Sequence, residues 1–254
     1  MALVDLSDCE WGLIRPLLPN KPRGVARVDD RRVLNGIVWV LTTGSPWRDL
    51  PERHGPSTTI CNRFNRWAKA GVWVRVFETL AERSPDSLLL IDSSIIRAHQ
   101  QAAAEKGGAD RTLGRSRGGL STKINAMVDA RGLPAAITLS PGQASDKAAV
   151  AGLLALHPQP GDVTADRGCN ARAVLDLIAA HGGRGHIPTQ RDRKVQRSVD
   201  PVLSRQRNLI ERLFNGLKHF RKVATRYEMS AQTCLADVLT ASSRLWVRHH
   251  ESAC

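Results

Sequence analysis

The stretch LLLIDSSII, residues 88–96, decides the fold class of the larger part of this chain. A short apolar run between polar segments predicts a buried β-strand. Asp92 stands in the middle of that run, where an unpaired charge is costly to bury. The stretch therefore predicts a central strand and marks Asp92 as a candidate functional carboxylate, with a structural aspartate as the alternative.

The segments that follow this strand predict a mixed α/β domain. Strands are predicted within 119–142, where a turn at Asp129 to Gly132 separates two of them, and within 161–168 and 185–189; helices are predicted at 145–156 with Ser145 as cap, at 171–183, and from Arg207 to Glu228. The order is three strands, helix, strand, helix, strand, helix. It favours a ribonuclease-H-like fold over a doubly wound sheet, which alternates from the start.

Two further carboxylates are candidates in that fold. Asp166 ends the strand VTAD, and Glu211 lies in the last predicted helix. In a ribonuclease-H-like sheet the first and fourth strands are neighbours and the last helix packs across them, so Asp92, Asp166 and Glu211 converge. Three carboxylates repel one another unless cations neutralise them, and hard oxygen ligands favour Mg²⁺ or Mn²⁺. Two such ions about 4 Å apart support phosphodiester cleavage.

The last predicted helix has a basic polar side. At about 100° per residue, its polar side gathers Arg207, Glu211, Asn215, Lys218 and Lys222. One interpretation is a surface helix in which Glu211 pairs with neighbours at i−4 and i+4. The other is that the basic residues hold DNA phosphates over metal ions bound by the carboxylates.

Residues 1–84 predict a small all-α, helix-turn-helix-like domain, with the boundary at SPDS, residues 84–87, and a catalytic domain at 85–254. The helix STTICNRFNRWAKAG, opened by capping hydroxyls, places Arg63, Arg66 and Lys69 away from its apolar side. A second basic segment, the Gly-rich loop 105–119, contains Arg115 and Arg117 and is predicted to order on a phosphate backbone. The alternatives are a plain helix bundle and an unattached surface loop.

The charge balance points to a polyanionic partner. The 254 residues include 37 Lys and Arg against 24 Asp and Glu, which gives a formal net charge of +13. We expect double-stranded DNA as the partner rather than a membrane, because no apolar run approaches the roughly 20 residues of a spanning helix. No secretion signal precedes the first helix, so we expect a cytoplasmic protein. The five scattered cysteines argue against a zinc site or a disulfide framework.

Several stretches resemble the motifs of DDE transposases of bacterial insertion sequences, most closely the insertion-sequence-five family. They are LIDSSIIRAHQ, GRSRGGLSTKI, LSPGQASD, ADRGCNA and RNLIERLFNGLKHFRKVATRYE, together with the N-terminal WGLIRPLLP, DDRRVLNGIVWVLTTGSPWRDLPERHGP and NRFNRWAKAGVW. The resemblance implies that Asp92, Asp166 and Glu211 form the metal-binding triad. It also implies that Arg207 and Lys218 contact transposon-end DNA. Ser204 stands where the family usually has Tyr, and Cys169 and Asn170 stand where it has an aromatic residue and Asp.

The function that these observations predict is a transposase. We expect it to bind the terminal inverted repeats of its element, to cleave them with two Mg²⁺ or Mn²⁺ ions and to join the 3′-OH ends to target DNA, as a homodimer or a higher oligomer. Two alternatives remain at this point. One is an inactive copy that acts as a DNA-binding repressor, and the other is a ribonuclease-H-like nuclease without strand transfer.

Overall fold

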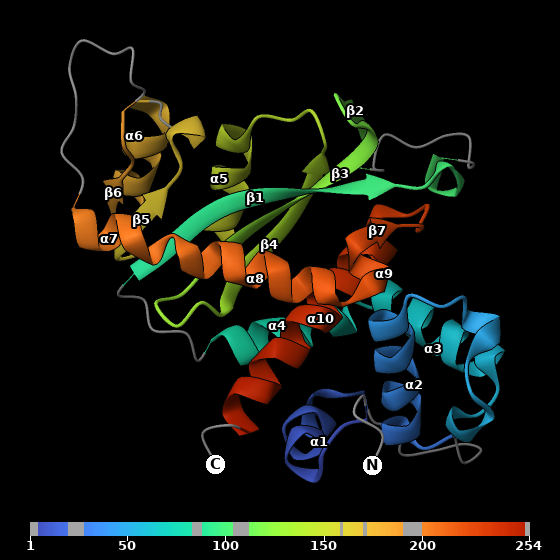
Figure 1. The fold of residues 1–254 in the computed structure, drawn as a ribbon. Coiled ribbons are helices and arrows are strands. Elements are labelled where there is room, and N and C mark those ends of the chain that lie inside the picture. Colours follow the sequence, from blue (N-terminus) through green and yellow to red (C-terminus); the bar gives the residue numbers. More distant parts are fainter. Residues whose placement is uncertain are drawn as a thin grey trace. The chain divides into compact units, whose positions relative to one another are not determined.

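The computed structural model describes residues 5–19, 28–82, 88–103, 112–157, 160–169, 172–189 and 200–251. The chain packs as two compact units, which are described separately (Figure 1). The sheet unit comprises Ala81–Ala98 and Gly108–Gly216, and the N-terminal unit comprises Met1–Leu80, His99–Gly107 and Leu217–Cys254.

The sheet unit is built on a mixed β-sheet. Its strands are β1 (Leu88–Ala98), β2 (Gly114–Ser116), β3 (Gly119–Val128), β4 (Pro134–Pro141), β5 (Asp162–Ala165) and β6 (Arg184–His186). β3 pairs antiparallel with β1, β2 and β4, whereas β5 runs parallel to both β1 and β6. The order β4-β3-β1-β5-β6 therefore runs through the sheet, with β2 also paired to β3, and the mixed α/β class predicted from the sequence is confirmed.

Helices cover both faces of this sheet. They are α5 (Asp146–Leu156), α6 (Arg172–Ala180), α7 (Pro201–Gln206) and α8 (Asn208–His219). One core joins the sheet to α5 and α6 through Leu89, Ile91, Met127, Val150, Leu153, Val163 and Ile178. Because side chains alternate along a strand, Leu88, Leu90 and Asp92 point to the opposite face. Figure 1 shows α8 crossing that face in front of the sheet, with α5 behind it.

The predicted turn between β3 and β4 is confirmed. Asp129 accepts hydrogen bonds at 2.9 Å from the N–H groups of Arg131 and Leu133. Gly132 has φ of 82°, a left-handed conformation that suits glycine. The predicted loop 105–119 is only partly confirmed, because β2 and the start of β3 form a hairpin within it; residues 105–111 lie outside the described part.

The single helix predicted from Arg207 to Glu228 agrees with the structure at its start, where α8 begins at Asn208, and is wrong in its C-terminal part. α7 precedes it, α8 ends at His219, and the remainder forms the short helix α9 (Arg221–Ala224) and the strand β7 (Thr225–Arg226). The break falls at Phe220, whose φ and ψ of −75° and 98° are extended. Its ring is buried, so packing overrides the helical pattern at a place with neither Gly nor Pro.

The N-terminal unit is helical. Besides α9 and β7 it contains α1 (Asp8–Ile14), α2 (Asp30–Thr43), α3 (Ser57–Lys69), most of α4 (Val72–Ala81) and α10 (Ala231–Glu251), with 3₁₀ turns at Arg15–Leu17, Trp47–Asp49, Glu52–His54 and Gln100–Ala103. α10 packs against α1, α2 and α3. The unit thus joins the two ends of the chain, whereas the sequence predicts a division at residue 84. Residues 83–87, which contain that boundary, lie outside the described part.

Helix ends in this unit follow local sequence signals in part. Ser7 caps α1 in a reciprocal arrangement with Glu10, because each side chain accepts the backbone N–H of the other residue. α2 ends at Gly44, whose φ of 70° is a left-handed conformation that suits glycine. The predicted hydroxyl cap of α3 is wrong, since Pro56 takes the cap position and no side chain bonds there. In the sheet unit, Ser145 likewise takes the cap position of α5 without a capping side-chain bond.

No helix among the described residues combines the length and the apolar character needed to cross a bilayer.

Candidate active site

Asp92 and Asp166 stand side by side on the sheet. β1 and β5 run parallel, and their register pairs Ile91 with Ala165, so each aspartate directly follows a paired residue. Asp92 points away from the core formed with α5 and α6. Two parallel strands thus bring together two carboxylates that lie far apart in sequence, as the sequence predicts.

The two carboxylates are held in similar ways. The backbone N–H of Ser93 donates to Oδ1 of Asp92 at 2.7 Å. The backbone N–H of Arg167 donates to Oδ1 of Asp166. Each aspartate is therefore fixed by the peptide group that follows it, which limits the rotation of its side chain.

The surroundings disfavour the ionised form of Asp92. Burial raises the pKa of its carboxyl above the usual range, and the nearby charges of Asp166 and Asp146 add to the rise. The hydrogen bond from Ser93 and the positive charge of Arg207 act in the opposite direction. An anionic group in such a place is stabilised by a cation, so the donor chemistry of this pair fits a hard divalent metal ion.

The pKa of the Cys169 thiol is raised by burial and by the same group of negative charges. Burial raises the pKa of its thiol to about 11, and the charges of Asp146, Asp92 and Asp166 contribute to the rise. Cys169 therefore stays a neutral thiol near the carboxylates. Asn170, the other departure from the family pattern, lies outside the described residues.

Glu211 lies in the first turn of α8, on its exposed side, in the same unit as the two aspartates. The opposite side of α8 buries Ile210, Leu213 and Phe214. Among the residues that the structure describes, no three His, Cys, Asp or Glu side chains lie close enough together to hold a metal ion. The structure thus brings Asp92 and Asp166 together and leaves Glu211 outside a closed ligand set.

Arg207, the residue between α7 and α8, faces the acidic pair. Its Nη1 lies 3.5 Å from Oδ1 of Asp166, and both side chains are partly exposed. Lys218 lies in the last turn of α8, about two helical turns after Glu211, and is partly exposed. Ser204 lies within α7, and its side chain is outside the described part.

The other predicted DNA contacts divide into exposed and buried side chains. Arg66, Lys69, Arg115 and Arg117 are exposed. Arg63 is 6% exposed and pairs with Asp30, so its expected place on the outer side of α3 is wrong. The inward turn of α3 places this guanidinium where it also donates to the Val28 carbonyl at 3.1 Å.

Lys222 is also buried rather than part of a basic helix face. It lies in α9 and pairs with Glu228, with Asp237 at 3.9 Å. Burial lowers the pKa of its ammonium, but the two carboxylates outweigh burial and raise it. Lys222 therefore does not share a helix face with Glu211, contrary to the prediction, because the helix breaks at Phe220.

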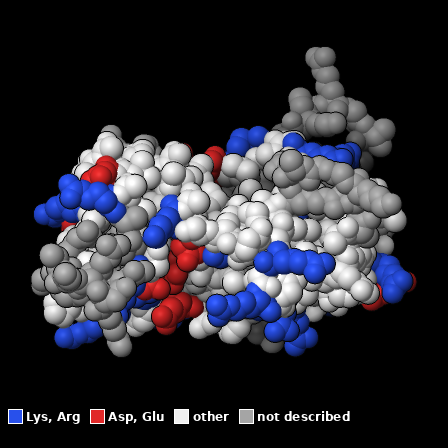
Figure 2. Space-filling view, turned by 90° about the horizontal axis from the view of Figure 1, so that it is seen from above, with Lys and Arg blue, Asp and Glu red and all other residues white. Residues whose placement is uncertain are grey.

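Figure 2 shows how charge is distributed on one face of the molecule. Lys and Arg side chains are spread widely over this face, whereas most of the visible acidic side chains gather in one group.

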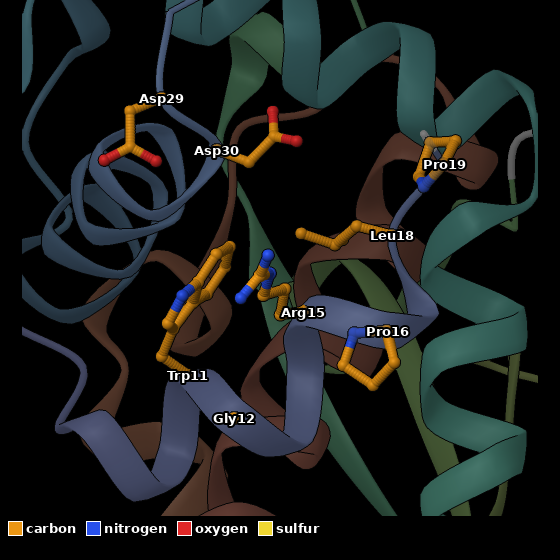
Figure 3. Close-up of a pocket in the computed structure, with 8 residues that line it drawn as sticks. All are labelled: Trp11, Gly12, Arg15, Pro16, Leu18, Pro19, Asp29 and Asp30. Carbon is orange, nitrogen blue, oxygen red and sulfur yellow. The ribbon is translucent and has the colours of Figure 1, made fainter. Parts of the chain in front are cut away.

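Two pockets lie within the N-terminal unit. One, of about 670 Å³, is lined by Trp11, Gly12, Arg15, Pro16, Leu18, Pro19, Asp29 and Asp30. Figure 3 shows the Arg15 side chain extending between Trp11 and Leu18. The other, of about 700 Å³, includes Trp47, Lys69, Lys222 and Tyr227 in its lining. Neither pocket contains a carboxylate of the predicted triad.

Comparisons with known families identify the chain. Residues 83–243 match the family described as a transposase DDE domain, and residues 6–77 match the family described as a putative transposase of the IS4/5 family. The chain belongs to the DDE transposases. The resemblance stated from the sequence motifs is thereby confirmed, and the transposase is a DNA-cleaving enzyme.

Three relatives are consistent with this family. The transposase is 32% identical over 130 residues to a putative transposase of insertion sequence element IS6501 from Brucella ovis, which spans 51% of this chain and all of the relative. It is 42% identical over 112 residues to an uncharacterized 16.2 kDa protein of insertion element IS402 from Burkholderia cepacia, over 39% of this chain and 76% of that protein. An uncharacterized protein of Sinorhizobium fredii, y4sN, is 38% identical over 111 residues, 43% of this chain and 86% of its own.

The sequence analysis missed one charged group next to the aspartates. Asp146, the first residue of α5, accepts hydrogen bonds from Ser93 and Lys123. No spacing rule connects these three residues, because they come from a helix and two strands. The only local sign is a lysine within the apolar strand β3, where a buried cation needs a partner.

Proposed function

We propose that the transposase cleaves phosphodiester bonds at the ends of its element and transfers the 3′-OH ends to target DNA. The observation that carries this proposal is the placement of Asp92 and Asp166 after paired residues of neighbouring parallel strands. The strand order β4-β3-β1-β5-β6, with β3 antiparallel and β5 and β6 parallel, supports a ribonuclease-H-like catalytic fold.

Asp92, Asp166 and Glu211 are the proposed ligands of two Mg²⁺ or Mn²⁺ ions. When bound, such ions activate the attacking water and stabilise the leaving 3′ oxygen. The chain itself orients the two aspartates through the backbone N–H groups of Ser93 and Arg167. Glu211 completes the ligand set by a movement of its side chain or of the first turn of α8, because it does not close the set in this structure.

The proposed DNA contacts are the exposed or partly exposed basic residues. Arg207 and Lys218 hold phosphates near the carboxylates, and Arg115 and Arg117 bind from the β2–β3 hairpin. Arg66 and Lys69 bind from α3, which serves as the basic helix of a helix-turn-helix-like reader in residues 1–84, while residues 85–254 supply the chemistry. Arg63 and Lys222 are left out, because both are buried in ion pairs.

The reaction takes place on chromosomal DNA, so we place the transposase in the cytoplasm. Two element ends must be joined in one event, which requires at least two copies of the active site. A homodimer or a higher oligomer in the complex with paired ends meets this requirement.

A cleavage and joining assay tests the proposal. The substrate is DNA that carries the inverted repeats flanking the gene, incubated with the full chain and Mg²⁺. We expect cleavage at the repeat ends and joined products, both lost in Asp92→Asn and retained in Asp176→Asn. Asp176 is a matched control because it is an exposed aspartate of α6 that pairs only with Arg172 among the ion pairs of the described residues. Binding without cleavage would favour a repressor, and cleavage without joining would favour a nuclease.

A further inference from the structure

An ion pair between the buried Lys123 and the partly exposed Asp146 lies on the side of the sheet opposite to Asp92. Lys123 of β3 is 8% exposed, and its Nζ donates to Oδ1 of Asp146 at 2.8 Å and to the Ala144 carbonyl at 2.7 Å. The Ser93 hydroxyl donates to the same Oδ1 at 2.5 Å. The carboxylate of Asp146 thus joins the start of α5 to two adjacent strands.

This group reaches Asp92 through a single residue. Ser93 follows Asp92 in β1, so the two side chains point to opposite faces of the sheet. The backbone N–H of Ser93 binds the Asp92 carboxylate, while its hydroxyl binds Asp146. A shift of Asp146 would therefore move the peptide group that orients Asp92.

The same carboxylate lies close to the segment that follows Asp166. A Cβ built on Gly168 would lie 3.6 Å from Oδ2 of Asp146, so the carboxylate passes beside this backbone. Arg167, whose N–H holds Asp166, is the residue between Asp166 and Gly168. Asp146 therefore contacts Ser93, whose peptide group fixes Asp92, and lies near the backbone that follows Arg167, whose peptide group fixes Asp166.

The charge of Asp146 is already matched within the protein. Both of its hydrogen bonds fall on Oδ1, and one comes from the ammonium of Lys123. A carboxylate neutralised in this way is suited to bracing the backbone rather than to binding a cation.

We propose that Asp146, held in place by Lys123, is a positioning residue that sets the spacing of Asp92 and Asp166 for metal binding. This role rests on the proposed metal-dependent cleavage. Residues that orient metal ligands from behind typically change metal affinity or activity by about 10–100-fold when they are substituted.

The test measures the binding of Mn²⁺ alone to the full chain by calorimetry, together with the unfolding temperature and the kcat and KM of end cleavage. The variants are Asp146→Asn and Ser93→Ala, and Ser93→Ala leaves the Lys123–Asp146 pair in place in case Asp146→Asn does not fold. Ser145→Ala is the matched control, because this neighbouring serine makes no capping bond.

We expect both variants to weaken Mn²⁺ binding about tenfold and to lower kcat, with KM for DNA unchanged. The unfolding temperature should stay unchanged in Ser93→Ala and fall in Asp146→Asn, which takes the charge partner from the buried Lys123. Lys123→Met should behave in the same way, and Lys123→Arg should restore Mn²⁺ affinity because it keeps the charge.

Three results would overturn this role. If Ser93→Ala and Asp146→Asn both bind Mn²⁺ as tightly as the wild type, the Lys123–Asp146 pair only stabilises the fold, whether or not the unfolding temperature falls. Complete loss of Mn²⁺ binding in Asp146→Asn with no change in Ser93→Ala would make Asp146 a ligand. If the wild type binds no Mn²⁺, or Asp92→Asn binds it normally, the proposed metal site itself fails and the positioning role fails with it.

Discussion

Asp92 combines partial burial with a negatively charged neighbourhood, and this sets its behaviour without metal. Burial and the charges of Asp166 and Asp146 raise the pKa of its carboxyl. The folded chain therefore binds the proton of Asp92 more tightly than the unfolded chain does. Its contribution to stability is most favourable below the unfolded pKa and is lost as the pH rises through the folded pKa. At neutral pH the ionised carboxylate costs stability until a cation binds.

This linkage predicts the stability of Asp92→Asn. At pH 7 without metal, the variant should unfold a few degrees higher than the wild type, because about 1 kcal/mol corresponds to 2–4 °C in a chain of this size. Mg²⁺ should raise the unfolding temperature of the wild type and leave that of the variant nearly unchanged. Calorimetric scans at pH 4 and pH 7 provide the check, since the advantage should shrink at low pH. A variant that is less stable than the wild type at both pH values would contradict the assignment.

The triad predicts a common outcome for three substitutions. Asp92→Asn, Asp166→Asn and Glu211→Gln should each abolish Mg²⁺-dependent cleavage, because each removes one negative ligand. DNA binding should be retained or improved, since no basic contact is lost. Cleavage and mobility-shift assays on the same preparations measure both properties. If Glu211→Gln kept strong activity, α8 would supply no ligand and the triad would be wrong.

At the scale of elements, α3 separates a structural arginine from two candidate DNA contacts. Arg63→Ala should lower the free energy of unfolding by about 3–5 kcal/mol, because it removes a buried guanidinium and its ion pair with the largely buried Asp30. Arg66→Ala with Lys69→Ala should leave stability unchanged. It should weaken binding to end DNA and reduce the salt dependence by about two counterions. Urea unfolding and binding titrations over a range of salt separate the two classes; an unchanged salt slope would make α3 a plain bundle helix.

The break between α8 and α9 separates two lysines with different expected roles, the partly exposed Lys218 and the buried Lys222. Lys218→Ala should fold normally, bind Mn²⁺ and reduce the salt slope of DNA binding by about one. Joining should suffer more than nicking, because strand transfer needs two DNA molecules held in register. Lys222→Ala should instead destabilise the fold, since it leaves Glu228 without its buried ion-pair partner. Wild-type DNA affinity of Lys218→Ala with and without Mg²⁺ would remove Lys218 from the phosphate contacts.

The elements that follow simple rules are those that the sequence predicts well. β1 and β4 are largely apolar runs between turn residues, and the turn before β4 depends on Gly132. β2, with the sequence GRS, lies instead in a segment predicted as a loop. The predicted exposure of Arg63 and Lys222 is wrong for the same reason. Helical periodicity gives the side of a helix on which a residue lies, but not whether another segment covers that side. Glu211 is found by the family motif, and its distance from Asp92 depends on packing that no motif specifies.

At the scale of the whole molecule, the longest helix is the one that the sequence analysis overlooked. α10 buries polar and charged side chains, among them Asp237, Thr240, Ser242 and Arg244, beside its buried apolar residues, so its apolar pattern is hard to recognise. The hydroxyls of Thr240 and Ser242 donate to carbonyls one turn earlier, which satisfies them inside the core. Arg244 forms a buried pair with Glu10 of α1, a contact between the two ends of the chain. A pattern search for apolar periodicity misses a helix of this kind.

This arrangement makes a prediction about residues 1–84, which the sequence marks as a separate domain. In the structure α10 packs against α1, α2 and α3, and Arg244 forms an ion pair with the buried carboxylate of Glu10. A fragment of residues 1–84 should therefore expose an apolar surface and a buried acid, and should lack a cooperative thermal transition. The fragment joined by a flexible linker to residues 217–254 should regain that transition, and Arg244→Met in the joined fragment should lose much of it. Circular dichroism melts of the three proteins measure this; a cooperative melt of residues 1–84 alone would show that the first domain ends where the sequence places it and that α10 is an addition to an already complete core.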